Sequence, residues 1–209
     1  MPGKQYDSYG GVTARPRESL LQAVLRFVLE ARNYHSTHRI ALIGSLTTSK
    51  PLPKDADVLV TIEDGVDLGP LAAAGRRLQG SAQQINLGAD IFLADTEGRY
   101  LGRICHYRKC HPRVQCRAQH CGQRERLNDD LGVVTLSRKT IETPAVILWP
   151  RVAANTPVAE DVKAFLLASL NSRPVAEGVL CPVRPQRVAS GNARSEHVWA
   201  AKPPGADLA

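Results

Sequence analysis

Apolar residues recur along the first hundred positions with two different periods, and this pattern predicts the secondary structure. From Arg17 to about Asn33 the apolar residues return at helical spacing, which indicates an amphipathic helix. Short apolar runs at 39–43, 56–62 and 89–94 predict buried strands, and 68–84 predicts a second helix. The order helix, strand, loop, strand, helix, strand is typical of an α/β (α+β) fold.

The rest of the chain divides by composition. Residues 1–16 are rich in Gly, Pro, Ser and Thr, and residues 173–209 have five prolines and no apolar periodicity, so we expect a flexible N-terminus and a disordered tail. One domain is then expected over 17–172. Its later part predicts short strands at 133–136 and 146–149, and a helix at 158–170 with Thr156 as its N-cap.

Three aspartates stand at the starts of predicted strands. Asp55 and Asp57 open the second strand, where alternate side chains share a face. Two neighbouring carboxylates repel each other unless a cation lies between them, and Mg²⁺ prefers such oxygen ligands. Asp90 opens the third strand, so a magnesium site formed by Asp55, Asp57 and Asp90 is expected. Asp95 is the alternative third acid, but Asp90 flanks its strand as Asp57 does.

The first strand ends in Gly44-Ser45, a turn suited to phosphate. Glycine lets the backbone approach an anion closely, and the amides and the serine hydroxyl can donate hydrogen bonds. The loop that follows contains Lys50 and Lys54, either of which can supply a positive charge. We therefore predict nucleotide binding by Gly44, Ser45 and Lys50, with Lys54 as the alternative to Lys50.

Residues 38–95 resemble the polymerase-beta-like nucleotidyltransferase superfamily, particularly its small minimal members. There, a strand ends in Gly-Ser, and after a variable loop the next strand begins Asp-x-Asp, with a third acid on a later strand. The resemblance implies that Gly44 and Ser45 contact a triphosphate and that Asp55 and Asp57 ligate Mg²⁺. Asp90 would be the third acid, which in that family often helps to deprotonate the attacking hydroxyl. Many small members have Arg or Lys and a second Gly after Gly-Ser, where this chain has the sequence Leu46-Thr47-Thr48-Ser49-Lys50.

The resemblance also implies a fold and a reaction. The fold is a mixed sheet flanked by helices, and the reaction moves a nucleoside monophosphate from ATP or another nucleoside triphosphate to an acceptor hydroxyl, with two Mg²⁺ ions. RNA, a protein side chain or a small molecule is the possible acceptor. The alternative is a non-catalytic protein of the same fold that binds nucleic acid or acts as one partner of a toxin–antitoxin pair. The atypical phosphate loop favours this alternative.

Four of the five cysteines lie between positions 105 and 121, interleaved with three histidines. Zinc takes four Cys or His ligands, so this density predicts a structural zinc site within a basic insert at 99–126. The expected ligands are Cys110, Cys116 and Cys121, and the fourth is Cys105, His111 or His120. The spacings exceed those of common zinc fingers. Cys181 lies in the expected tail and is not part of the cluster.

The net charge of +7 is concentrated in the same stretch, because residues 99–126 hold eight Lys or Arg and a single Glu. A basic patch favours polyanionic partners such as RNA or nucleotide phosphates. No stretch approaches the ~20 apolar residues of a membrane span, and the N-terminus lacks a signal-peptide core. We therefore expect a cytoplasmic protein without membrane contact, and the sequence assigns no oligomeric state.

Overall fold

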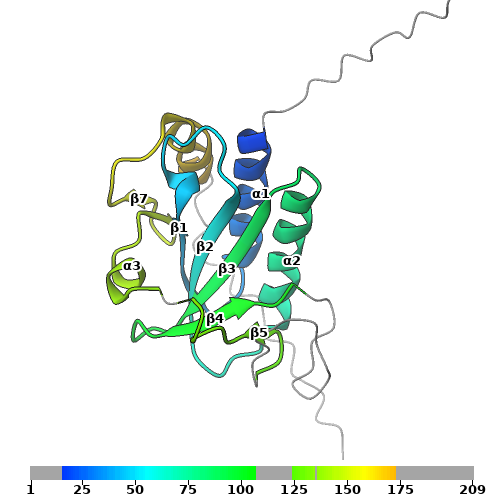
Figure 1. Cartoon of the computed structure of the whole chain (residues 1–209). Helices are drawn as coiled ribbons and strands as arrows, with labels where there is room; N and C mark the ends of the chain where they lie inside the picture. Colours follow the sequence, from blue (N-terminus) through cyan, green and yellow to red (C-terminus); the bar gives the residue numbers. More distant parts are fainter. Residues whose placement is uncertain (1–15, 107–123, 135, 173–209) are drawn as a thin grey trace, which may run out of the picture. The chain divides into compact units, whose positions relative to one another are not determined.

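The computed structural model of the protein describes residues 16–106, 124–134 and 136–172. Within these ranges the chain forms a seven-stranded sheet with helices, so the expected mixed α/β class is confirmed (Figure 1). The elements are α1 (Pro16–Ala31), β1 (Thr37–Ile43), η1 (Ser45–Thr47), β2 (Asp55–Ile62), α2 (Gly69–Gln83), β3 (Gly88–Ala94), β4 (Tyr100–Ile104), β5 (Leu127–Asn128), α3 (Arg138–Glu142), β6 (Val146–Trp149), β7 (Ala153–Ala154), η2 (Val162–Leu167) and α4 (Ala168–Asn171).

The order of strands across the sheet is β5-β4-β3-β2-β1-β6-β7. Strands β2 and β3 are parallel, whereas β1 is antiparallel to β2 and β4 is antiparallel to β3. The last residues of β1 and β4 therefore meet the first residues of β2 and β3 at one end of the sheet. In the register of the sheet, Ile43 pairs with Asp57, and Asp57 pairs in turn with Asp90.

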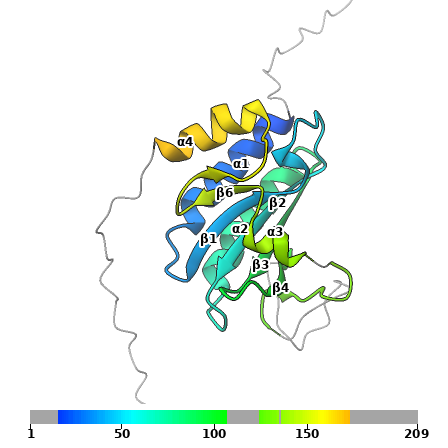
Figure 2. The same ribbon diagram turned by 90° about the vertical axis from the view of Figure 1, so that its left-hand side faces the viewer.

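The two faces of the sheet are covered by different elements. Helices α1 and α2 lie together on one face, and α3 lies on the other (Figures 1 and 2). The even-numbered residues of β2, such as Val58 and Val60, are buried in the core with α1 and α2. The odd-numbered Leu59 belongs to a second core with Phe92 of β3 and Ile141 of α3. This alternation is the usual consequence of the two-residue period of a strand.

The early helices and strands lie where the apolar pattern predicts them, but two later predictions are wrong. Residues 133 and 134 form a turn rather than a strand, because the amides of Val133 and Val134 both donate to the carbonyl of Asp130 at 2.8 Å. The last helical stretch begins at Glu160, so Thr156 is not its N-cap. The segment before it is tied to η1, where the Ala159 amide donates to the Thr47 carbonyl at 3.0 Å.

Strand β4 was not expected, because residues 100–104 were predicted to begin the metal-stabilised insert. It pairs with both β3 and β5 and belongs to the main sheet. Its Gly102 has a φ of 127° and lies against β5, where a Cβ would come within 2.6 Å of the Asn128 carbonyl oxygen. This glycine interrupts the apolar pattern of residues 100–104, so the pattern does not predict the strand. Among the described helices, none is both long enough and apolar enough to cross a membrane.

Candidate active site

The predicted site residues follow or open three neighbouring strands, β1, β2 and β3, and lie at the end of the sheet where β1 and β4 finish. Gly44 and Ser45 follow β1, the aspartates 55 and 57 open β2, and Asp90 lies near the start of β3. Asp57 and Asp90 are register partners in parallel strands, so their side chains point to the same side of the sheet. That side is the one opposite α1 and α2, since the intervening Val58 is buried under those helices. The structure thus brings the three predicted aspartates together.

Asp57 carries an unfavourable charge in this arrangement. Its pKa is raised from an ordinary value of 3.8 to about 7, first by burial and then by the negative charges of Asp55 and Asp90. The guanidinium of Arg103 opposes the shift only in part. An added positive charge between the carboxylates would relieve this repulsion.

Asp90 has an arginine and a histidine partner that the sequence did not reveal. Its Oδ1 accepts a hydrogen bond from Nη1 of Arg103 at 3.1 Å and lies 3.4 Å from Nε2 of His106. Burial alone would raise the pKa of Asp90, but the His106 hydrogen bond and the Arg103 charge outweigh it and hold this pKa below its usual value. Asp90 is therefore ionised near neutral pH, whereas Asp57 is not fully so.

Arg103 is fixed from behind by a buried acid. Its Nε lies 2.5 Å from Oδ2 of Asp130, which is fully buried. Tyr100 donates its hydroxyl to Oδ1 of the same carboxylate at 2.8 Å, and burial together with this bond raises the tyrosine pKa, so the hydroxyl stays a donor. Arg103 lies opposite Phe92 in the register, on the face of the acids. Sequence reasoning missed it because β4 was not recognised.

Gly44 brings the loop after β1 into contact with the acids. It has a φ of 70°, and a Cβ added there would lie 2.0 Å from Oδ2 of Asp57. Both the backbone conformation and the space require glycine at this position. The one-turn helix η1 begins at the next residue, Ser45, so the loop predicted to bind phosphate directly adjoins the predicted metal ligands.

The two lysines proposed as phosphate partners are exposed on the loop between η1 and β2. Within the described residues, hydrogen bonds hold the backbone of these two lysines rather than their side chains. The Lys50 carbonyl accepts a hydrogen bond from Arg17 at 2.9 Å, and the Lys54 carbonyl accepts one from the Gly88 amide at 2.8 Å. Arg103, rather than either lysine, is the cation that the structure places in contact with the acid cluster.

Asp95, the alternative third acid, lies at the opposite end of β3. Its Oδ1 accepts from the amides of Glu97 and Arg99 at 2.9 and 2.8 Å, and its Oδ2 accepts from Nε of Arg99 at 2.6 Å. These bonds shape the turn that leads into β4. Burial alone would raise the pKa of Asp95, but the bonds from Arg99 lower it. Asp95 therefore has a structural role, and the geometry selects Asp90 as the neighbour of Asp57.

The chemistry of the cluster fits a hard dication, although the side chains are not arranged around one. Within the described ranges, no group of three or more His, Cys, Asp or Glu side chains is placed to hold a metal ion. Asp90 instead turns Oδ1 towards Arg103 and His106. Three neighbouring carboxylates are nevertheless the kind of oxygen donors that Mg²⁺ prefers, and both contacts of Asp90 use Oδ1.

Comparison with family models places these residues in a recognised family. Residues 9–127 match DUF6932, a family of unknown function. The chain belongs to this family. Comparison with curated proteins and with solved structures finds no match. The matched stretch runs through Gly44, the three aspartates and Arg103, whereas Asp130, which supports Arg103, lies beyond it. The DUF6932 stretch therefore holds every residue of the cluster except this buried support.

The predicted zinc site lies mostly outside the described residues of this DUF6932 protein. Cys110, Cys116, Cys121, His111 and His120 all fall within 107–123. Cys105 is described, and it is buried at the end of β4, with its amide donating to the Arg126 carbonyl at 2.9 Å. The zinc site therefore stays a prediction that rests on the sequence.

Four of the eight basic residues predicted to form a cationic patch are described, and all four are paired with acids. The pairs are Arg99–Asp95, Arg99–Glu97, Arg103–Asp90, Arg103–Asp130, Arg124–Asp64, Arg126–Asp67 and Arg126–Glu125. Their charges are therefore compensated within the DUF6932 fold, and they do not form an unpaired basic surface. The other four, Arg108, Lys109, Arg113 and Arg117, lie outside the described residues.

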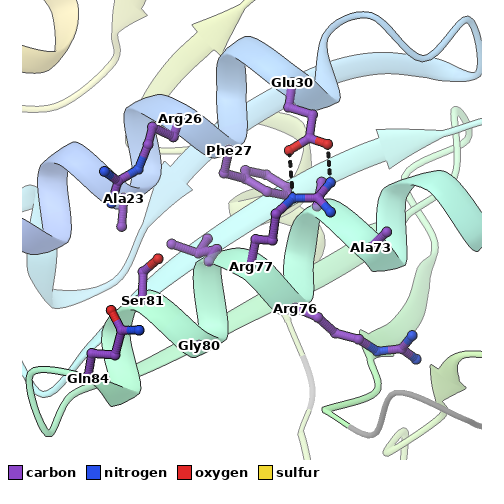
Figure 3. A pocket seen from close by; sticks show the side chains of 12 residues that line it. Ala23, Arg26, Phe27, Glu30, Ala73, Arg76, Arg77, Gly80, Ser81 and Gln84 are labelled. Carbon is purple, nitrogen blue, oxygen red and sulfur yellow. Dashed lines mark hydrogen bonds and ion pairs between the residues drawn. The ribbon is translucent and has the colours of Figure 1, made fainter.

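A separate groove of about 730 Å³ runs between α1 and α2 (Figure 3). Arg77 of α2 forms an ion pair with Glu30 of α1 across it, and Ser81 and Gln84 also line it. The two helices cover the face of the sheet that is opposite to the acids, so this groove is not part of the candidate active site.

Proposed function

We propose that this protein is a nucleotidyltransferase, which transfers a nucleoside monophosphate from a nucleoside triphosphate to an acceptor hydroxyl. The observation that carries the proposal is the register of the sheet, because it pairs Asp57 with Asp90 and brings the end of β1 beside Asp57, where Gly44 follows. A glycine turn for phosphates beside paired carboxylates is the arrangement that the resemblance to the superfamily implies. The order of β1, β2 and β3, with a helix between the parallel pair, also supports it.

Each group has a chemical role in this proposal. Asp55 and Asp57 would hold Mg²⁺, with Asp90 as the third ligand, and the loop at Gly44-Ser45 would receive the triphosphate through its amides. Mg²⁺ bound there would neutralise the phosphate oxygens and the charge that develops on the leaving pyrophosphate. The repulsion that raises the pKa of Asp57 would be relieved by such a cation.

Asp90 is the carboxylate that we assign to receive the proton of the acceptor hydroxyl, as the third acid often does in the resembled superfamily. Its carboxylate is ionised, and it lies at the side of the cluster away from the phosphate loop, since β2 separates β3 from β1. Arg103 would remain held by Asp130 when Asp90 engages the substrate. The acceptor hydroxyl then attacks the α-phosphorus, its proton passes to Asp90, and pyrophosphate leaves with the electron pair of the broken bond.

The alternative of a non-catalytic nucleic-acid-binding protein gains no support from the described cations. All four of those within 99–126 are paired with acids, and an ion pair leaves little charge to attract a phosphate backbone. The acid cluster would itself repel nucleic acid in the absence of a cation.

The test is to incubate the protein with each labelled nucleoside triphosphate and Mg²⁺, and to measure pyrophosphate release and label transfer to RNA or to the protein itself. Asp57→Asn should abolish transfer while the fold is retained. The matched control is Asp64→Asn, the same chemical change in the turn that follows β2, where the side chain is half exposed. Equal activity in Asp57→Asn and wild type would overturn the assignment.

A further inference from the structure

The loop after β1 departs from the resembled family in sequence, yet the structure holds it firmly from outside. Arg17, in the first turn of α1, donates to three of its backbone carbonyls. Its Nη1 lies 2.9 Å from the Lys50 oxygen, and its Nη2 lies 2.9 Å from the Leu46 oxygen and 2.8 Å from the Thr48 oxygen. Only 12% of the Arg17 side chain is exposed. A planar guanidinium with five donors is the side chain that can serve several carbonyls at once.

Asp161 holds Arg17 in place from the other side. It forms an ion pair with Nε of Arg17, and its Oδ1 accepts from Nη2 at 3.0 Å. The same Oδ1 accepts from the Val162 amide at 2.9 Å, so Asp161 is itself anchored at the start of η2. Arg17 and Asp161 are 144 positions apart in the sequence, and together they link α1, the loop and the last helical segment.

The consequence is that the carbonyl groups of the loop are turned away from the acid cluster. Besides the three bound by Arg17, the Thr47 carbonyl accepts from the Ala159 amide at 3.0 Å. Four carbonyl oxygens between residues 46 and 50 are therefore directed towards α1 and the segment before η2. A loop that binds phosphate has to present its N–H groups and keep its carbonyl oxygens away from the anion.

We propose that Arg17, supported by Asp161, is a positioning residue that shapes the phosphate loop for triphosphate binding. It acts through the backbone and does not touch the substrate. This inference rests on the proposed nucleotidyltransferase function and adds to it the element that prepares the loop.

The variants follow from the contacts. Arg17→Gln removes the forked donors, and Arg17→Lys keeps the charge but cannot reach three carbonyls together. Asp161→Asn keeps the three carbonyl bonds and removes the charge that holds the guanidinium. The matched control is Arg77→Gln, which breaks another ion pair of α1, that with Glu30 in its last turn, whereas Arg17 lies in the first turn.

Two measurements separate positioning from a general loss of stability. Amide hydrogen exchange should become faster at residues 46–50 in Arg17→Gln and stay unchanged there in Arg77→Gln. The KM for the triphosphate should rise about tenfold in Arg17→Gln with a much smaller change in kcat, because the residue orders the binding loop and does not contact reacting atoms. Arg17→Lys and Asp161→Asn should give smaller increases in KM.

The binding of Mg²⁺-triphosphate to the wild-type protein is measured first, so that the two hypotheses fail separately. If the wild type binds none, the proposed function is overturned, and with it the positioning role of Arg17. If the wild type binds and Arg17→Gln binds equally well, only the positioning role is overturned. Unchanged exchange at 46–50 in Arg17→Gln would also overturn it, since the loop would then hold its shape without the guanidinium.

Discussion

Replacing Asp57 by asparagine should stabilise the protein at alkaline pH in the absence of divalent cations. In the folded protein the pKa of Asp57 is about 7, whereas its ordinary value is 3.8. The folded state therefore binds the proton more tightly than the unfolded state. The favourable contribution of protonated Asp57 is complete below pH 3.8 and is lost as the pH rises through 7. Asparagine has the same shape and does not ionise, so Asp57→Asn avoids this loss.

The size of the effect follows from the shift. One pKa unit corresponds to ~1.36 kcal/mol, so a shift from 3.8 to about 7 sets an upper limit of ~4 kcal/mol. Asp57 is only partly buried, and solvent screening reduces the expected gain to about 2 kcal/mol. For a chain of this length that corresponds to a rise in Tm of about 4–8 °C.

The assay is thermal unfolding of wild type, Asp57→Asn and Asp64→Asn, with a chelator present, at several pH values from about 4 to 8.5. The difference between Asp57→Asn and wild type should be small near pH 4 and should grow until about pH 8. Adding Mg²⁺ should raise the Tm of wild type more than that of the variant, because a cation removes the same repulsion. A variant that is equally or less stable than wild type at pH 8.5 would refute the reasoning, since Asp57 would then be a solvated strand end.

Three further changes have defined expectations. Gly44→Ala should lower stability by about 1–3 kcal/mol in chemical denaturation and should abolish transfer, because its Cβ collides with Asp57 at a positive φ. Asp130→Ala should cost about 3–5 kcal/mol in the same assay, since it leaves the charge of Arg103 half-paired. Metal analysis of untagged protein should find about one zinc per chain, and Cys116→Ser should lower that content.

The sequence predicts those parts of the fold that depend on local periodicity. Helix α1 and strands β1, β2 and β3 have continuous apolar patterns, and the structure places each within two residues of the predicted bounds. The acids at the starts of β2 and β3 could be placed on one face from strand alternation alone. Their closeness depends on β2 and β3 being neighbouring parallel strands, which the apolar pattern alone does not specify.

The supporting residues could not be predicted in the same way. Arg103 requires knowledge that β4 lies beside β3, and β4 is short and contains Gly102. Arg17 binds a loop about thirty positions away in the sequence, and it pairs with Asp161, which is 144 positions away. No local sequence pattern indicates either contact. Single-sequence reasoning detects the elements that carry a site more readily than the long-range pairs that fix its geometry.

The two ends of β3 show why the acid cluster is more than a set of solvated strand termini. Asp95, at one end, is only 3% exposed, yet bonds from Arg99 and backbone amides lower its pKa. Hydrogen bonds and an ion pair thus stabilise the negative charge of this buried carboxylate, which has a structural role. At the other end Arg103 compensates Asp90, while Asp57 keeps a pKa of about 7 beside two further acids. A destabilising charge left uncompensated next to a strained glycine turn is characteristic of functional sites, and a cation that arrives with a phosphate ligand would complete the pairing.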